Sequence, residues 1–243
     1  MAVGVRGGPG SSDPGQFTAT NSTLLAIVMQ AYDVPSFRLS GPSWLYTERF
    51  NIVAKVPAGT TGNQFRVMLQ NPLAERFNLV AHEESRRAPV FAMVIDSGGI
   101  KMKESRKSTA TEGDPPPPSG MPAMGKDGFP KIPAGQKGVW SNFNGDHFLI
   151  QANQMTTAIL AELLSNQLNR PVIDETGLKA PYDFTLEFSP TETSAAPPED
   201  GQESESTPSI FSAVKHLGLK LEPGKGPVQM LVVDSIEKTP TEN

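Results

Sequence analysis

The chain has 243 residues, which is enough for one large domain or for two domains of about 100 residues each. Its formal charge of −5 argues against a nucleic-acid binder, and no apolar run reaches the ~20 residues that span a bilayer. It contains no cysteine, which excludes disulfides and thiolate chemistry, and only three histidines. We therefore expect no cofactor, no metal site, no nucleic-acid partner and no transmembrane segment.

The first half of the chain reads as β-α-β-β-α-β-β. Alternating β-branched residues predict a strand at 16–23, and apolar residues at helical spacing predict a helix that ends before Pro35. Two strands and a second helix follow, and Pro72 inside this helix predicts a kink or a break. The half closes with residues 78–99, which read as two strands around a polar turn.

The second half repeats this order from residue 147 and ends in a predicted hairpin at 218–238, with "EPGKG" as its turn. The closing strands carry one motif: "APVFAMVIDS" at 88–97 and "GPVQMLVVDS" at 226–235 share five of ten residues. Because several elements match, we interpret the chain as an internal duplication. Chance recurrence of a valine-rich strand is the alternative.

We therefore predict an α+β fold of two tandem β-α-β-β-α-β-β copies, residues 16–103 and 147–238. Residues 104–146 contain four consecutive prolines and read as a linker, and the acidic residues 191–208 read as a disordered insertion. The element order is similar to that of the N-terminal modules of secretins and TonB-dependent receptors, which is an analogy of fold alone. The predicted core comprises Phe17, Leu24, Ile27, Val28, Phe50, Ile52, Leu69, Val90, Val94, Leu160, Leu164, Phe184, Leu186, Phe211, Val228 and Val232.

Three carboxylates of the second half could do chemistry: Asp174, Glu175 and Asp183. Paired carboxylates suit general acid–base catalysis when their environments separate their pKa values. "DETGL" suits a turn better, because its aspartate can accept backbone hydrogen bonds and Gly177 can supply a positive φ. A hydrolase built on this cluster is therefore the alternative function.

Other residues are candidates for binding. Trp44 and Tyr46 are either core aromatics or exposed anchors for a peptide or glycan, and we prefer the core. Arg86 and Arg87 belong to a basic cluster that reads as a solvated face or as a contact for an acidic partner, and Asp174 is the remaining candidate. The sequence "HEES" does not predict a metal site, because neighbours on a strand point to opposite faces.

Long stretches resemble a known family. "GGPGSSDPGQFTATNSTL", "SGPSWLYTERFNIVAKVP", "PLAERFNLVAHEESRRAPVFAMVIDSGG", "NRPVIDETGLKAPYDFTLEFSP" and "VVDSIEKTPTEN" are similar to the bacterial "soil-associated protein" family, a domain of unknown function. The resemblance implies an exported protein of the cell envelope, periplasmic or extracellular, although the first residues lack the apolar core of a signal peptide. It also implies that some members are joined to antibiotic-sensor-type membrane metallopeptidases.

The sequence contains no catalytic constellation, so we expect a non-catalytic binding or protein-interaction module of the bacterial envelope. Its partner would be a protein or peptide, because exposed strands can accept a partner strand. A sensor domain for a membrane peptidase is a further alternative, which depends on the resemblance alone.

Overall fold

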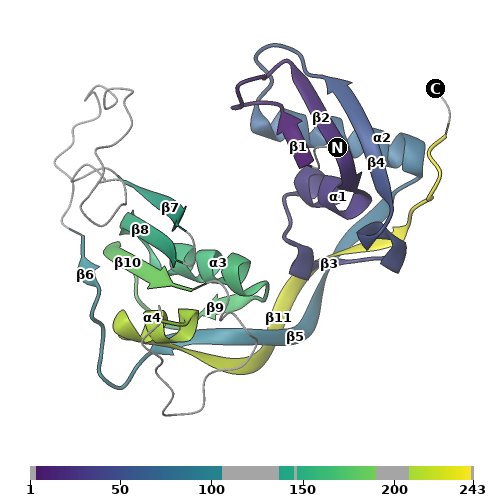
Figure 1. Ribbon diagram of the computed structural model, residues 1–243. Helices are drawn as coiled ribbons and strands as arrows, with labels where there is room; N and C mark the ends of the chain where they lie inside the picture. The colour runs from purple at the N-terminus through teal and green to yellow at the C-terminus, as the bar shows by residue number, and fades with distance from the viewer. Residues whose placement is uncertain (1–3, 106–136, 145–146, 190–207, 242–243) are drawn as a thin grey trace. The chain divides into compact units, whose positions relative to one another are not determined.

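The computed structural model describes residues 4–105, 137–144, 147–189 and 208–241. Unit 1 comprises the residues up to Ala88 and those from Pro227 onward, and unit 2 comprises Pro89–Gly226. The described part has four α-helices and several sheets, so the predicted α+β class is confirmed (Figure 1). None of the described helices is both long and apolar enough to cross a bilayer.

Unit 1 has two helices, α1 (Leu24–Tyr32) and α2 (Gly62–Phe77), which pack on each other. Between α1 and β4 the chain forms the short strand β3 (Leu39–Ser40) and the 3₁₀ helix η2 (Ser43–Tyr46). Apolar side chains of the helices and of the sheet form one core. The antiparallel sheet has the order β1-β2-β4, and its strands are β1 (Gly4–Gly7), β2 (Gln16–Thr23) and β4 (Arg49–Lys55).

Helix α2 is not broken at Pro72. It begins with a capping box in which Thr61 and Gln64 satisfy each other's backbone N–H groups, and it ends at Asn78 in the left-handed region (φ 48°). Its apolar face is buried every three to four residues, at Phe65, Leu69, Leu73 and Phe77. Caps at both ends and a buried face outweigh the one helical hydrogen bond that proline removes.

Unit 2 has the same kinds of element, with helices α3 (Thr157–Leu168) and α4 (Ile210–His216) and the short strand β9 (Val172–Asp174). Strand β7 lies in the range that the sequence predicts as a linker, and residues 106–136 and 190–207 lie outside the described part. The sheet has the order β6-β10-β8-β7, and its strands are β6 (Lys103–Glu104), β7 (Gly138–Asn144), β8 (His147–Met155) and β10 (Tyr182–Phe188).

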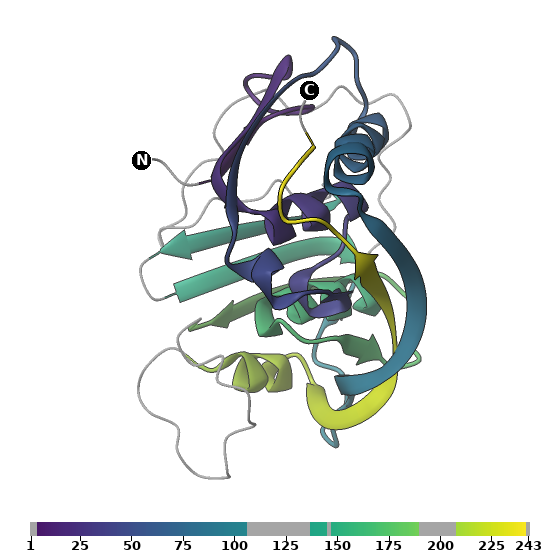
Figure 2. The ribbon, with the colours of Figure 1, turned by 90° about the vertical axis from the view of Figure 1, so that its right-hand side faces the viewer.

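The two predicted hairpins are wrong, because each is one long strand. Residues Val80–Ile95 form β5 without a turn at "HEESRR", and Leu219–Ser235 form β11 without a turn at "EPGKG". A tight hairpin turn needs positive φ angles, and neither Gly224 nor Gly226 has one. Strands β5 and β11 are neighbours in a sheet of order β3-β11-β5-β9, and they run side by side in Figures 1 and 2.

As a result, each unit receives its last strand segment from the other half of the sequence. In unit 1, Leu231 and Val232 of β11 pair in parallel with β3. In unit 2, residues 91–93 of β5 pair in parallel with β9. The compact units therefore differ from the consecutive ranges 16–103 and 147–238 by this exchange of segments.

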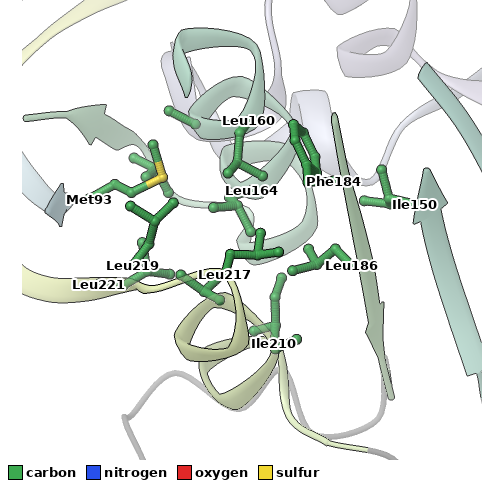
Figure 3. Packing of buried hydrophobic residues seen from close by; sticks show 14 of the residues in the cluster. Met93, Ile150, Leu160, Leu164, Phe184, Leu186, Ile210, Leu217, Leu219 and Leu221 are labelled. Carbon is green, nitrogen blue, oxygen red and sulfur yellow. The ribbon is translucent and has the colours of Figure 1, made fainter. Parts of the chain in front are cut away.

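The exchanged segments complete both cores. Leu231 and Val233 are buried in the core of unit 1. Phe91 and Met93 are buried in unit 2, where Met93 points toward Leu160 and Leu164 (Figure 3). Most of the predicted core residues are buried, and the exceptions are half-buried: Phe50, Ile52, Val94 and Val232. For Val94 and Val232 the reason is strand register, because Met93 and Leu231 take the inward positions.

Candidate functional site

Four of the five sequence-predicted binding residues lie in unit 1, and the fifth lies in unit 2. Trp44 and Tyr46 lie on η2, and Arg86 and Arg87 lie on the part of β5 that belongs to unit 1. Asp174 ends β9 in unit 2. Trp44 is half-buried against the core of unit 1, whereas the side chain of Tyr46 is exposed. Trp44 therefore contributes mainly to the packing of the unit 1 core.

The charged residues of "HEESRR" pair with one another and with β11. His82 Nδ1 lies 2.8 Å from a carboxylate oxygen of Asp234, and its Nε2 lies 3.6 Å from Glu84. Glu84 in turn forms an ion pair with Arg86. No group of three or more potential metal ligands is present in the described residues. These residues thus form a chain of solvent-exposed polar contacts along β5 and β11.

Asp174 is engaged in its own turn. Its Oδ1 accepts hydrogen bonds from the backbone N–H and the hydroxyl of Thr176, at 3.0 and 2.7 Å. Partial burial acts to raise the pKa of Asp174, but hydrogen bonds from Thr176 and Thr157 and the charge of Lys179 outweigh it and hold the pKa below its usual value. A carboxylate with these hydrogen bonds stays ionised and stabilises the turn.

Asp183 is engaged elsewhere. Its Oδ1 accepts hydrogen bonds from the Ser105 hydroxyl at 2.6 Å and from the backbone N–H of Gln154 at 2.9 Å. Asp183 also lines an open pocket of about 570 Å³, and neither Asp174 nor Glu175 is among the residues that line it. The three carboxylates of the hydrolase hypothesis therefore do not share this pocket.

The clearest unfilled feature of unit 1 is the edge of β4. Within the described residues, β4 pairs with β2 on one side and with no strand on the other. Its side chains alternate between half-buried positions that face the core and exposed positions, and Val53 is 67% exposed. An edge strand of this kind carries unpaired backbone N–H and C=O groups, which are a template for another strand.

An apolar groove of about 410 Å³ runs along this edge. The T-shaped contact between Phe50 and Phe77, at 5.3 Å between ring centroids, lies in its wall, and Arg76 places a cation there. The groove is lined by Ile27, Phe50, Asn51, Ile52, Val53, Ala54, Leu69, Pro72, Leu73, Arg76, Phe77 and Pro240. The unpaired backbone N–H and C=O groups of β4 thus lie next to apolar side chains that are partly exposed to solvent.

In unit 2, strand β10 has partners on both sides. Strand β6 pairs with it in antiparallel orientation, with Lys103 opposite Asp183 and Glu104 opposite Tyr182. Helix α4 packs against β10, whereas in unit 1 α2 packs on α1. The inward residues of β10 are accordingly at most 7% exposed (Tyr182, Phe184, Leu186), while those of β4 remain half-buried.

The sheets of the two units share one kind of irregularity. In β2, Asn21 has a positive φ of 50° and its N–H donates to Asn51 Oδ1 at 2.8 Å. In β8, Gln154 has a φ of 56° and its N–H donates to Asp183 Oδ1 at 2.9 Å. The strand register shifts at both places. Asn51 and Asp183 thus accept the same kind of backbone hydrogen bond, each beside a register shift in its own sheet.

Sequence reasoning missed this edge. The polar residues at this edge are Arg49, Asn51 and Lys55 of β4. The sequence did not predict β6, the strand that pairs with β10, because β6 is only two residues long.

Comparison with known proteins gives a family and no activity. A family model described as "Protein of unknown function (DUF3738)" matches residues 25–236. No curated protein and no solved structure matches the chain.

Proposed function

We propose a function for this chain, which belongs to the DUF3738 family of proteins of unknown function: it is a non-catalytic module that binds an extended segment of another protein. The segment would add to the β4 edge as a further antiparallel strand and place alternate side chains in the adjoining groove. The observation that carries the proposal is the open edge of β4 beside an apolar groove of about 410 Å³.

The proposal is supported by an example within the same chain. We propose that units 1 and 2 descend from one duplicated β-α-β-β-α-β unit, since β2, α1, β3, β4, α2 and β5 follow the order of β8, α3, β9, β10, α4 and β11. On this view β6 is a strand already added to the edge of β10, and the edge of β4 is the same site without its strand.

A hydrolase receives less support. Asp174 and Asp183 each accept two hydrogen bonds from neighbouring groups of the fold. General acid–base catalysis needs a carboxyl group that can reach a substrate proton and whose pKa lies near the operating pH. The lowered pKa of Asp174 points the other way.

We place the module in the bacterial cell envelope, periplasmic or extracellular, on the strength of the resemblance to the soil-associated protein family. If some relatives are joined to membrane peptidases, strand addition at β4 would be a means of sensing an exported protein segment. Secretion assays on the intact gene product test this placement.

The absence of cysteine allows a sharp test of the edge, because a single introduced cysteine is the only thiol. Val53 on β4 and Val5 on β1 are exposed valines at opposite edges of one sheet. We would select peptides from a random library on the full chain and cross-link them to Val53→Cys and Val5→Cys, each carrying a short photoreactive group. The proposal predicts cross-links from position 53 and few from position 5; equal or reversed labelling contradicts it.

A further inference from the structure

The two corresponding edges carry opposite charge. On β4 the exposed positions include Arg49 and Lys55. On β10 the exposed or half-buried positions include Asp183 and Glu187. Because the hydrogen bonds at the two register shifts align Asn51 with Asp183, Lys55 falls on Glu187. In this alignment Lys55 takes the place of Glu187, neutral Asn51 takes the place of Asp183, and Arg49 falls on Pro181, so the edge of unit 1 carries two cations and that of unit 2 carries two carboxylates.

The strand on the acidic edge has complementary chemistry. Lys103 of β6 lies directly opposite Asp183, and the Ser105 hydroxyl donates a hydrogen bond to the same carboxylate. The backbone N–H of Ser105 also donates to the Pro181 carbonyl, at 2.9 Å. Opposite charges across neighbouring strands are favourable and like charges are unfavourable. Strand β6 thus shows which kind of segment suits an acidic edge of this fold.

The cations at the edge of β4 have no carboxylate partner in the described part of the chain. The Arg49 guanidinium donates to the Asn21 carbonyl at 2.8 Å, and no ion pair of the described residues involves Lys55 or Arg76. Glu48, directly before β4, pairs with Lys238. Asn51 uses its Oδ1 for Asn21, which leaves its exposed amide NH₂ to donate outward. Each of these groups suits a carboxylate.

A second copy of the chain fits this edge poorly. Antiparallel pairing of two β4 strands about Ile52 places Arg49 of each copy opposite Lys55 of the other. Like charges directly opposite each other oppose such a pair. The edge therefore favours a different segment over itself.

We infer that the segment that binds β4 is acidic, with carboxylates facing Arg49, Asn51 and Lys55 and apolar side chains at the alternate positions facing the groove. This inference rests on the proposed function and names the chemical class of its partner. Where β6 places Lys103 opposite the carboxylate of Asp183, the proposed partner places a carboxylate opposite the cations of β4.

The test uses two labelled peptides of seven residues, the length of β4. The first, Glu-Val-Thr-Ile-Asp-Val-Glu, places carboxylates opposite the three polar positions of β4 in antiparallel pairing. The second replaces its three acids by lysine. We expect the full chain to bind the acidic peptide about tenfold more tightly or better, as two exposed charge pairs and one amide–carboxylate hydrogen bond predict, and the difference to shrink in high salt.

Charge reversal on the protein provides the second half of the test. Arg49→Glu combined with Lys55→Glu should invert the preference between the two peptides. The matched control is Arg6→Glu on β1, the opposite edge of the same sheet, which should leave the preference unchanged. Circular dichroism of each variant establishes that it is folded.

The outcomes separate the inference from the proposed function. Equal binding of both peptides, or tighter binding of the lysine peptide, overturns the acidic partner but leaves strand addition standing. If neither peptide binds while library peptides cross-link at position 53, the inference alone fails. If no library peptide labels position 53 either, the proposed function fails with it.

Discussion

At the scale of single residues, two side chains hold the same irregularity in the two units. Asn51 and Asp183 each accept the N–H of a residue in the left-handed region, Asn21 or Gln154, just before a helix begins. A non-glycine residue in that region is uncommon and persists when its surroundings fix it. These acceptors therefore help to define where β2 and β8 end.

We predict that Asn51→Ala lowers the free energy of unfolding of the full chain by about 1–2 kcal/mol, because it leaves the Asn21 N–H without its acceptor. Asp183→Ala should have at least this effect, since Asp183 accepts two hydrogen bonds. Urea unfolding measures both. The exposed Val53→Ala on the same strand is the control; an equal loss in that variant would contradict the role of the acceptors.

Asp174 gives a prediction about pH. Its pKa is lowered in the folded chain, so its ionised form adds stability above the usual aspartate pKa of about 3.9, and this stability is lost as the pH falls through the folded pKa. We expect Asp174→Asn to be less stable than the native chain at neutral pH and the gap to close in acid. Urea unfolding at a series of pH values measures the gap. For the exposed neighbour, Glu175→Gln should open a smaller gap, because Glu175 lacks the threonine hydrogen bonds.

At the scale of elements, local pattern predicted strands well where their neighbours are close in the sequence. Strand β2 has the predicted bounds 16–23, and α1, α3, β4, β8 and β10 lie where the hydrophobic periods place them. The two hairpin predictions were wrong because the alternation of apolar and polar residues, and the presence of turn residues, are the same whether a strand folds back or continues. The partners that decide this, β3 for β11 and β9 for β5, are far away in the sequence.

The edge of β4 could not be predicted for a similar reason. Its alternating residues identify a strand, but an edge is defined by a neighbour that is missing, which depends on the whole sheet. Trp44 and Tyr46 were candidate binding residues because of their aromatic type alone. The charges of Arg49 and Lys55 indicate the chemistry of a partner only when they are compared with those of Asp183 and Glu187.

Two glycines of β11 distinguish a continuous strand from a hairpin. Gly224 lacks a positive φ and a Cβ there would meet no atom within 4 Å, so Gly224→Ala should be neutral or stabilising by up to about 1 kcal/mol. A Cβ on Gly226 would lie 2.7 Å from Ile173 Cδ1 and 3.3 Å from Val90 Cγ2, so Gly226→Ala should be less stable than Gly224→Ala by up to about 1 kcal/mol, because these side-chain ends must shift. Urea unfolding measures both variants. A marked loss of stability in Gly224→Ala would indicate that the turn exists.

At the scale of the whole molecule, the exchange of strand segments ties the halves of the sequence together. The core of unit 1 includes Leu231 and Val233, and the core of unit 2 includes Phe91 and Met93. Each fragment of the chain would lack part of the core that it needs, and the loss of two large buried side chains costs about 4–10 kcal/mol, which is comparable with the stability of an ordinary domain.

We therefore predict that residues 1–120 and 121–243, expressed as separate chains, are unfolded or aggregated alone and regain native circular dichroism when they are expressed together. Cooperative thermal unfolding measured by circular dichroism is the readout. A fragment that unfolds cooperatively by itself would show that the exchanged segment is dispensable.

The most direct measurement on the proposed function is amide hydrogen exchange of β4, followed by NMR with and without the acidic peptide. Strand β2 protects the N–H groups on one side of β4, so those that point to the open edge should exchange fast in the free chain. Bound peptide should slow exchange at alternate residues between Arg49 and Lys55 and leave β1 unchanged. Saturation by peptide without added protection along β4, or with protection confined to another strand, would contradict strand addition at this edge.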